Sequence, residues 1–143
     1  GAIADADGIA WILETDPGKR LITAAKRIHA LDRSLKLKRE IPFAWTGPAS
    51  PEDAARPPAD RPTIRGTIDL LLADTKNKTA EILDYKTDSE WTWQAHLPAY
   101  QTQMLYYLAA ASAILRFPVT HATLLFLGPR QMHVVTLLPD TSP

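Results

Sequence analysis

The alternation of apolar and polar positions divides the chain into two helical stretches followed by a series of short strands. Apolar residues recur at helical spacing in residues 7–15 and again in 18–35, with a break at Asp-Pro-Gly in residues 16–18. A third helix is predicted over 99–115, where two neighbouring apolar stripes run side by side. Shorter runs predict strands at 38–45, 64–73, 79–86, 119–127 and 131–138. This order of elements indicates one mixed α/β sheet domain.

Prolines mark two irregular places in this pattern. Residues 46–62 hold five of the 12 prolines, and we expect a proline-rich loop over 46–63. Pro42 falls inside the first predicted strand and has no backbone N–H to donate to a ladder. The strand at 38–45 is therefore expected at an edge of the sheet or at a bulge.

Length and composition exclude several classes of protein. The 143 residues suffice for a single domain, and 45% hydrophobic and 22% charged residues are ordinary values for a globular protein. Because the chain has no cysteine, it holds no disulfide, zinc-thiolate site or catalytic thiol. No apolar run is long enough to span a membrane and no signal peptide opens the chain, so we expect a cytoplasmic protein without membrane contacts. The chain begins with Gly1 rather than Met, and we expect it to be a piece of a longer protein.

The basic residues are unevenly distributed although the formal net charge is zero. Half of the 16 Lys and Arg residues lie between Lys19 and Arg39, with Asp32 as the one acid among them. Such a basic stretch is suited to phosphate groups of nucleic acid. A solvated helix face explains the same pattern equally well.

Two acids are predicted to meet across a hairpin formed by the strands at 64–73 and 79–86. A turn centred between Lys76 and Asn77 pairs residues whose numbers add up to 153, and this register places Asp69 opposite Asp84 with Cβ atoms roughly 5 Å apart. A slip of one residue would send one acid to the other face of the sheet. Side chains alternate along a strand, so Lys86 shares the face of Asp84.

Carboxylates this close repel each other, and a divalent cation relieves the repulsion. Mg²⁺ or Mn²⁺ prefers oxygen ligands, and we expect Asp69, Asp84 and the backbone carbonyl of Tyr85 to hold it. Lys86 would orient a hydroxide or stabilise negative charge on a phosphate. The alternative is an exposed ion pair between Asp84 and Lys86 on a half-solvated sheet.

Four segments resemble motifs of the PD-(D/E)XK nuclease superfamily, and more closely of its RecB-like branch. They are REIPF (39–43), RGTIDLLL (65–72), ILDYKTD (82–88) and Y-x-x-Q-M-x-x-Y (100–107). The branch includes nuclease domains at the C-terminus of UvrD/Rep-type and AddA-type DNA helicases. The resemblance implies a restriction-endonuclease-like mixed central sheet flanked by helices. It also implies that Asp69 and Asp84 bind metal and that Lys86 is the catalytic lysine.

The resemblance implies roles for three further residues. Gln103 and Tyr107 match the family's Q-x-x-x-Y motif and are expected to reach DNA or the active-site lysine, since they lie one helical turn apart. The alternative is a polar edge on a helix that packs against the core. Glu40 matches an acid that recurs at this position in the family, and we expect it either near the metal or beside the basic stretch.

Members of the RecB-like branch usually carry a metal-binding histidine on a helix well before the REIPF-like strand. His29 falls only eleven residues before Glu40, so we do not expect it to be this ligand. We expect the ligand upstream of Gly1, which would leave the present chain weakly active or inactive alone. Trp91 and Trp93 either stack on unpaired bases or cover the core.

The expected function is a Mg²⁺- or Mn²⁺-dependent DNA nuclease acting beside helicase motor domains of the same protein in DNA repair. Endonuclease and exonuclease action both stay open. The alternative is a non-catalytic module that binds DNA or a partner protein through the same fold. A dimeric nuclease similar to junction resolvases or transposases is a third possibility.

Overall fold

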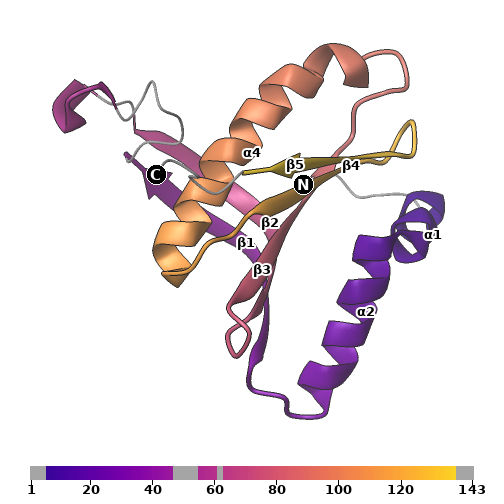
Figure 1. Cartoon of the computed structure of the whole chain (residues 1–143). Coiled ribbons are helices and arrows are strands. Elements are labelled where there is room, and N and C mark those ends of the chain that lie inside the picture. The colour runs from indigo at the N-terminus through magenta and orange to yellow at the C-terminus, as the bar shows by residue number, and fades with distance from the viewer. Residues whose placement is uncertain (1–5, 47–54, 61–62, 138–143) are drawn as a thin grey trace.

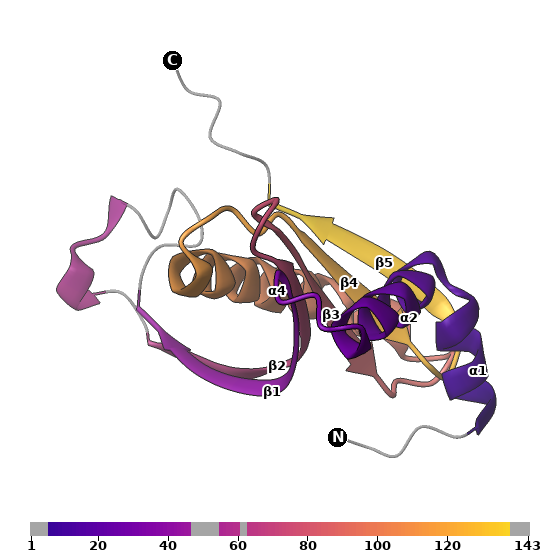
Figure 2. The ribbon, with the colours of Figure 1, turned by 90° about the horizontal axis from the view of Figure 1, so that it is seen from below.

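A five-stranded mixed sheet with helices on both sides forms the structure (Figures 1 and 2). The computed structural model describes residues 6–46, 55–60 and 63–137. Its helices are α1 (Ala6–Glu14), α2 (Asp16–His29), the short 3₁₀ helix η1 (Pro58–Asp60) and α4 (Trp93–Leu115). Its strands are β1 (Leu35–Trp45), β2 (Ile64–Asp74), β3 (Thr79–Lys86), β4 (His121–Phe126) and β5 (Gln131–Thr136). The architecture confirms the predicted α/β class and the restriction-endonuclease-like sheet flanked by helices.

The strands lie in the order β1-β2-β3-β4-β5. All neighbours are antiparallel except β3 and β4, which are parallel and are connected through α4. Strand β1 is at one edge, which confirms the position expected from Pro42. Of the proline-rich loop, residues 47–54 and 61–62 lie outside the described part of the chain, as does the end of the last predicted strand at residue 138.

Two predicted helix boundaries are wrong. Helix α2 ends at His29 instead of residue 35, because Leu31 adopts a left-handed backbone (φ 68°) and Asp32 accepts hydrogen bonds from the backbone and side chain of Ser34. Helix α4 begins at Trp93 rather than at residue 99, although Pro98 lies inside it. Trp93 packs against the core, and this contact outweighs the local effect of the proline.

The core lies between α4 and the sheet. Met104, Leu108 and Ala111 of α4 are at most 1% exposed, as the predicted apolar stripe requires. They contact a cluster of buried strand residues: Ile68, Leu71, Ile82, Ala122, Leu124, Phe126 and Val135. Helix α2 lies against the other side of the sheet (Figure 1). No helix within the described residues is long and apolar enough to cross a membrane.

Candidate active site

The two predicted acids lie together where β2 and β3 separate. The observed pairing follows the predicted register, with Leu70 opposite Leu83 as the last pair of the ladder. The next residues are Asp69 and Asp84. The backbone N–H of Tyr85 donates a hydrogen bond to the side-chain carboxylate of Asp69 at 2.9 Å and not to a main-chain carbonyl of β2. Since β3 pairs with β4 along this stretch, the strands form a fork with both carboxylates at its base.

Lys86 is held by contacts from two elements. Its Nζ lies 2.8 Å from Oδ2 of Asp84 and donates a hydrogen bond to Oε1 of Gln103 on α4 at 2.9 Å. The same Nζ lies over the ring of Tyr100, 4.2 Å from its centroid. Gln103 in turn donates from Nε2 to the hydroxyl of Tyr107 at 3.1 Å. The sequence left open whether Gln103 contacts the lysine or forms a polar edge on a core-packing helix. In the structure it contacts the lysine.

Burial controls the electrostatics of the site. Asp84 is only 3% exposed, and its pKa is raised from 3.8 to about 6, because burial together with the charge of Asp69 outweighs the opposing effect of Lys86. Within the described residues, Oδ2 of Asp84 has the ion pair with Lys86 but no aligned hydrogen bond. Burial and the nearby Asp84 also raise the pKa of Tyr107, so its hydroxyl stays neutral at physiological pH.

The acids and the lysine line a pocket of about 900 Å³. One wall is polar and comes from the strands, including Arg39 and Glu40 of β1. The other wall is apolar and comes from Ile12 and Leu13 of α1 and Leu21 of α2. The helical hairpin α1–α2 therefore borders the site. Its tight connection requires Gly18, where a Cβ would come 1.8 Å from the carbonyl oxygen of Ile12.

Glu40 has a strained backbone at this pocket. Its φ of 51° lies in the left-handed region, which a non-glycine residue adopts only at a cost. Its neighbours in the chain pair with Leu70 and Ile68 of β2. Glu40 therefore interrupts the ladder opposite Asp69 and joins the two acids at the pocket wall.

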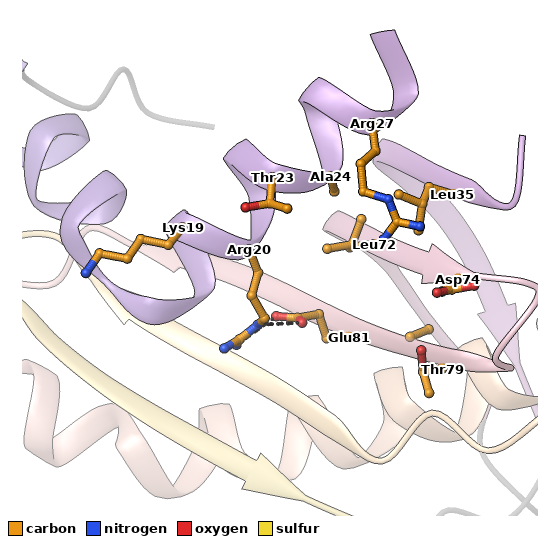
Figure 3. Close-up of a pocket in the computed structure, with 11 residues that line it drawn as sticks. Lys19, Arg20, Thr23, Ala24, Arg27, Leu35, Leu72, Asp74, Thr79 and Glu81 are labelled. Carbon is orange, nitrogen blue, oxygen red and sulfur yellow. Dashed lines mark hydrogen bonds and ion pairs between the residues drawn. The ribbon is translucent and has the colours of Figure 1, made fainter. Parts of the chain in front are cut away.

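The basic stretch divides between two pockets, since its last residue, Arg39, lines the larger one. Lys19, Arg20 and Arg27 border a smaller pocket of about 400 Å³ between α2 and the sheet (Figure 3). Arg20 forms two hydrogen bonds with Glu81 at 2.9 and 3.1 Å, and Arg27 lies 2.7 Å from Asp32. Two cations of the stretch therefore pair with acids of the same chain.

The histidine of the basic stretch is also away from the acids. His29 is exposed at the end of α2 and does not line the larger pocket. This position agrees with the expectation that His29 is not the metal-binding histidine.

The aromatic contact of Lys86 is itself supported by further side chains that the sequence pattern did not predict. The hydroxyl of Tyr100 donates to Oδ1 of Asp88 at 2.8 Å, and Nδ1 of His96 contacts the other oxygen of the same carboxylate. The signal was present in the chain. Tyr100 lies one helical turn before Gln103, and Asp88 ends the segment that also contains Lys86.

The two tryptophans after β3 have different environments. Trp93 is partly buried with its ring centroid 5.1 Å from that of Phe126, so it covers the core. Trp91 is 85% exposed.

The donor set fits a hard divalent cation. Among the described residues, no three His, Asp or Glu side chains converge as a ready-made metal site. Two adjacent carboxylates are nevertheless sufficient for Mg²⁺ or Mn²⁺, because these ions keep several of their own waters. The raised pKa of Asp84, whose buried carboxylate lies beside Asp69, is the feature that a bound cation would relieve.

Comparison with protein families agrees with this geometry. The family model of the PD-(D/E)XK nuclease superfamily matches residues 12–140. The chain belongs to the PD-(D/E)XK nuclease superfamily. No curated protein shows significant similarity to it. In this PD-(D/E)XK chain, the matched region includes the whole sheet, α4 and the fork that holds the two acids.

Proposed function

We propose that the chain is a Mg²⁺- or Mn²⁺-dependent nuclease domain that hydrolyses phosphodiester bonds of DNA. The observation that carries the proposal is the cluster of Asp69, Asp84 and Lys86 in one pocket. Membership of the nuclease superfamily supports the same reaction class. The two acids come from adjacent strands and the lysine from the strand that carries Asp84, so one rigid hairpin positions all three.

The metal is assigned to Asp69, Asp84 and the backbone carbonyl of Tyr85. When bound, the cation supplies Lewis-acid stabilisation of the charge that develops on the phosphate. Glu40 adds a third negative charge to the pocket wall. Burial of Asp84 contributes as well, because it strengthens the attraction between this carboxylate and a cation.

Lys86 is assigned to the phosphate. Its ammonium group donates to Gln103 and pairs with Asp84, and the ring of Tyr100 covers it from a third side. These contacts fix the long side chain before substrate arrives, which lowers the entropic cost of placing its charge beside a phosphate oxygen. Gln103 and Tyr107 act through the lysine in this proposal.

Cleavage of single- and double-stranded DNA by the intact protein, which is expected to carry the upstream histidine, with Mg²⁺ or Mn²⁺ tests the proposal. Asp84→Ala and Lys86→Ala should each reduce the rate by at least roughly 100-fold, the usual effect of removing a group that stabilises transition-state charge. Lys76→Ala, in the exposed β2–β3 turn, is the matched control and should cut like the unchanged protein. Equal rates for all three variants would show that the mechanism is wrong.

The longer protein is a separate part of the proposal. The resemblance of residues 39–107 to RecB-like domains supports a role beside helicase motor domains in DNA repair. ATP-dependent unwinding by the intact protein, coupled to cleavage, is the expected behaviour. An intact protein without a nucleotide-binding motor would contradict this part and leave the nuclease proposal in place.

A further inference from the structure

Trp91 is the most exposed large apolar side chain among the described residues, at 85%. It lies in the connection between β3, which carries Lys86, and α4, which carries Gln103. Trp93, two residues further on, points into the core against Phe126. Packing therefore explains Trp93 and leaves Trp91 without a structural role.

The backbone that presents Trp91 is well held. Its N–H donates to Oγ of Ser89 at 3.3 Å, and the N–H groups of Thr92 and Trp93 both donate to the carbonyl oxygen of Ser89 at 3.2 Å. The β4–β5 turn also packs against this connection, since a Cβ at Gly128 would come 2.4 Å from the carbonyl oxygen of Asp88. The indole therefore extends into solvent from a supported loop.

This loop is close to the proposed catalytic lysine. Trp91 follows Lys86 by five residues, which span at most about 17 Å when fully extended. Asp88, at the start of the loop, is linked to the lysine through Tyr100. The connection that carries Trp91 therefore begins beside the lysine, and we take a DNA strand with one phosphate at Lys86 to extend along it.

The surroundings of Trp91 favour a nucleobase over a protein partner. Apart from Ala95, its exposed neighbours in the chain are polar: Ser89, Glu90, Thr92, Gln94 and His96. A protein interface usually needs a contiguous apolar patch, whereas one aromatic ring suffices to stack a base. In a duplex, neighbouring base pairs cover the faces of each base, so only an unpaired base offers a free face.

We propose that Trp91 is a stacking platform for an unpaired base and that the substrate is single-stranded DNA. The inference rests on the proposed nuclease function and names its substrate class.

Binding of a 15-nucleotide oligothymidylate in EDTA tests the inference without cleavage. The intrinsic tryptophan emission of the unchanged chain should be quenched on binding. Trp91→Ala should weaken binding roughly tenfold, which is the effect of losing one stacked base. The factor should be the same at low and high salt, because stacking releases no counterions. Trp91→Phe should bind within about threefold of the unchanged chain while losing most of the quenching, because phenylalanine still stacks.

Ile114→Ala, which truncates a 59% exposed side chain on α4, is the matched control and should change neither signal. A duplex of the same length should bind equally well to the unchanged chain and to Trp91→Ala. The inference is overturned if Trp91→Ala binds the oligothymidylate like the unchanged chain, or if the duplex is weakened by the same factor. Stacking at Trp91, combined with no cleavage of DNA by the intact protein, would contradict the nuclease proposal alone.

Discussion

The hydroxyl of Tyr107 lies directly against Gly66, where a Cβ would come 2.9 Å from it. Phe43 of β1 holds the same ring edge-on, with the two centroids 4.8 Å apart. From this position Tyr107 accepts a hydrogen bond from Gln103, which itself accepts one from Lys86. The glycine three residues before Asp69 therefore makes room for the helix side chains that hold the lysine.

Gly66→Ala should displace Tyr107 and with it Gln103. We expect a loss of about 1–3 kcal/mol of unfolding free energy, the usual cost of overpacking, and a fall in cleavage rate of at least about tenfold. Thermal unfolding and single-turnover cleavage measure the two effects. The double variant Gly66→Ala/Tyr107→Leu removes the clashing ring and should recover part of the stability but not the rate. A fully active Gly66→Ala would show that the close contact has no bearing on the site.

Gln103→Ala should lower kcat by roughly 10- to 100-fold with little change in KM, because the lysine loses a positioning contact rather than a substrate contact. Gln103→Glu keeps an acceptor for Lys86 but loses the amide N–H that reaches Tyr107, so an intermediate kcat is expected. Lys86→Arg should be as inactive as Lys86→Ala, since the planar guanidinium does not match the contacts of an ammonium group. A change in KM alone would indicate that Gln103 contacts DNA instead.

The stability contributed by Asp88 should depend on pH. Burial alone would raise the pKa of Asp88, but hydrogen bonds from His96 and Tyr100 outweigh it and hold that pKa below 3.8. A carboxyl with a depressed pKa stabilises the fold above its unfolded pKa and loses this contribution as the pH falls through the folded pKa. Asp88→Asn should therefore destabilise the protein at pH 7 by on the order of 1 kcal/mol, and the difference should shrink as the pH falls below 3.8.

Chemical denaturation at a series of pH values measures this difference. Asp60→Asn, at an exposed aspartate in η1, is the control and should leave stability nearly unchanged at every pH. Tyr100→Phe removes one of the two hydrogen bonds to Asp88 and should reduce the pH-dependent part. A cost of Asp88→Asn that is equal at pH 3 and pH 7 would contradict the assignment.

Mn²⁺ should raise the midpoint of thermal unfolding, because an ion that binds only the folded state stabilises it by about 2.7 kcal/mol at 100 times its dissociation constant. Asp69→Asn and Asp84→Asn should each remove most of this shift, since each deletes one of the two proposed carboxylate ligands. Asp74→Asn is the matched control, because its carboxylate caps the β2–β3 turn by accepting from Lys76 and Asn77. A shift that survives in both ligand variants would place the metal elsewhere.

No Mn²⁺-induced shift even in the intact protein, combined with DNA binding, would favour the non-catalytic module over the nuclease. That result would agree with the absence of three convergent acidic or histidine side chains among the described residues. Cleavage by Asp84→Ala at the normal rate would instead contradict the assignment of Asp84 to the mechanism while leaving nuclease activity in place.

Local periodicity was sufficient to find the hairpin and its register. Strand β3 begins and ends at the predicted residues, and the pairing of Leu70 with Leu83 follows the predicted sum of residue numbers. Helix ends were less predictable, because Trp93 and Leu97 pack against the core and extend α4 past Pro98. Such a contact depends on residues more than thirty positions away and leaves no local signal.

The sequence by itself determined which residues form the candidate site: two acids and a lysine on a strand–turn–strand unit, whose alternation places them on one face. Only the tertiary structure decided how they are held. The packing of α4 on the sheet brings Gln103 and Tyr100 to Lys86, and the interrupted β1–β2 ladder leaves Glu40 at the position opposite Asp69. Alternation along a strand is a property of consecutive residues, whereas these contacts join separate elements and exist only once the core has formed.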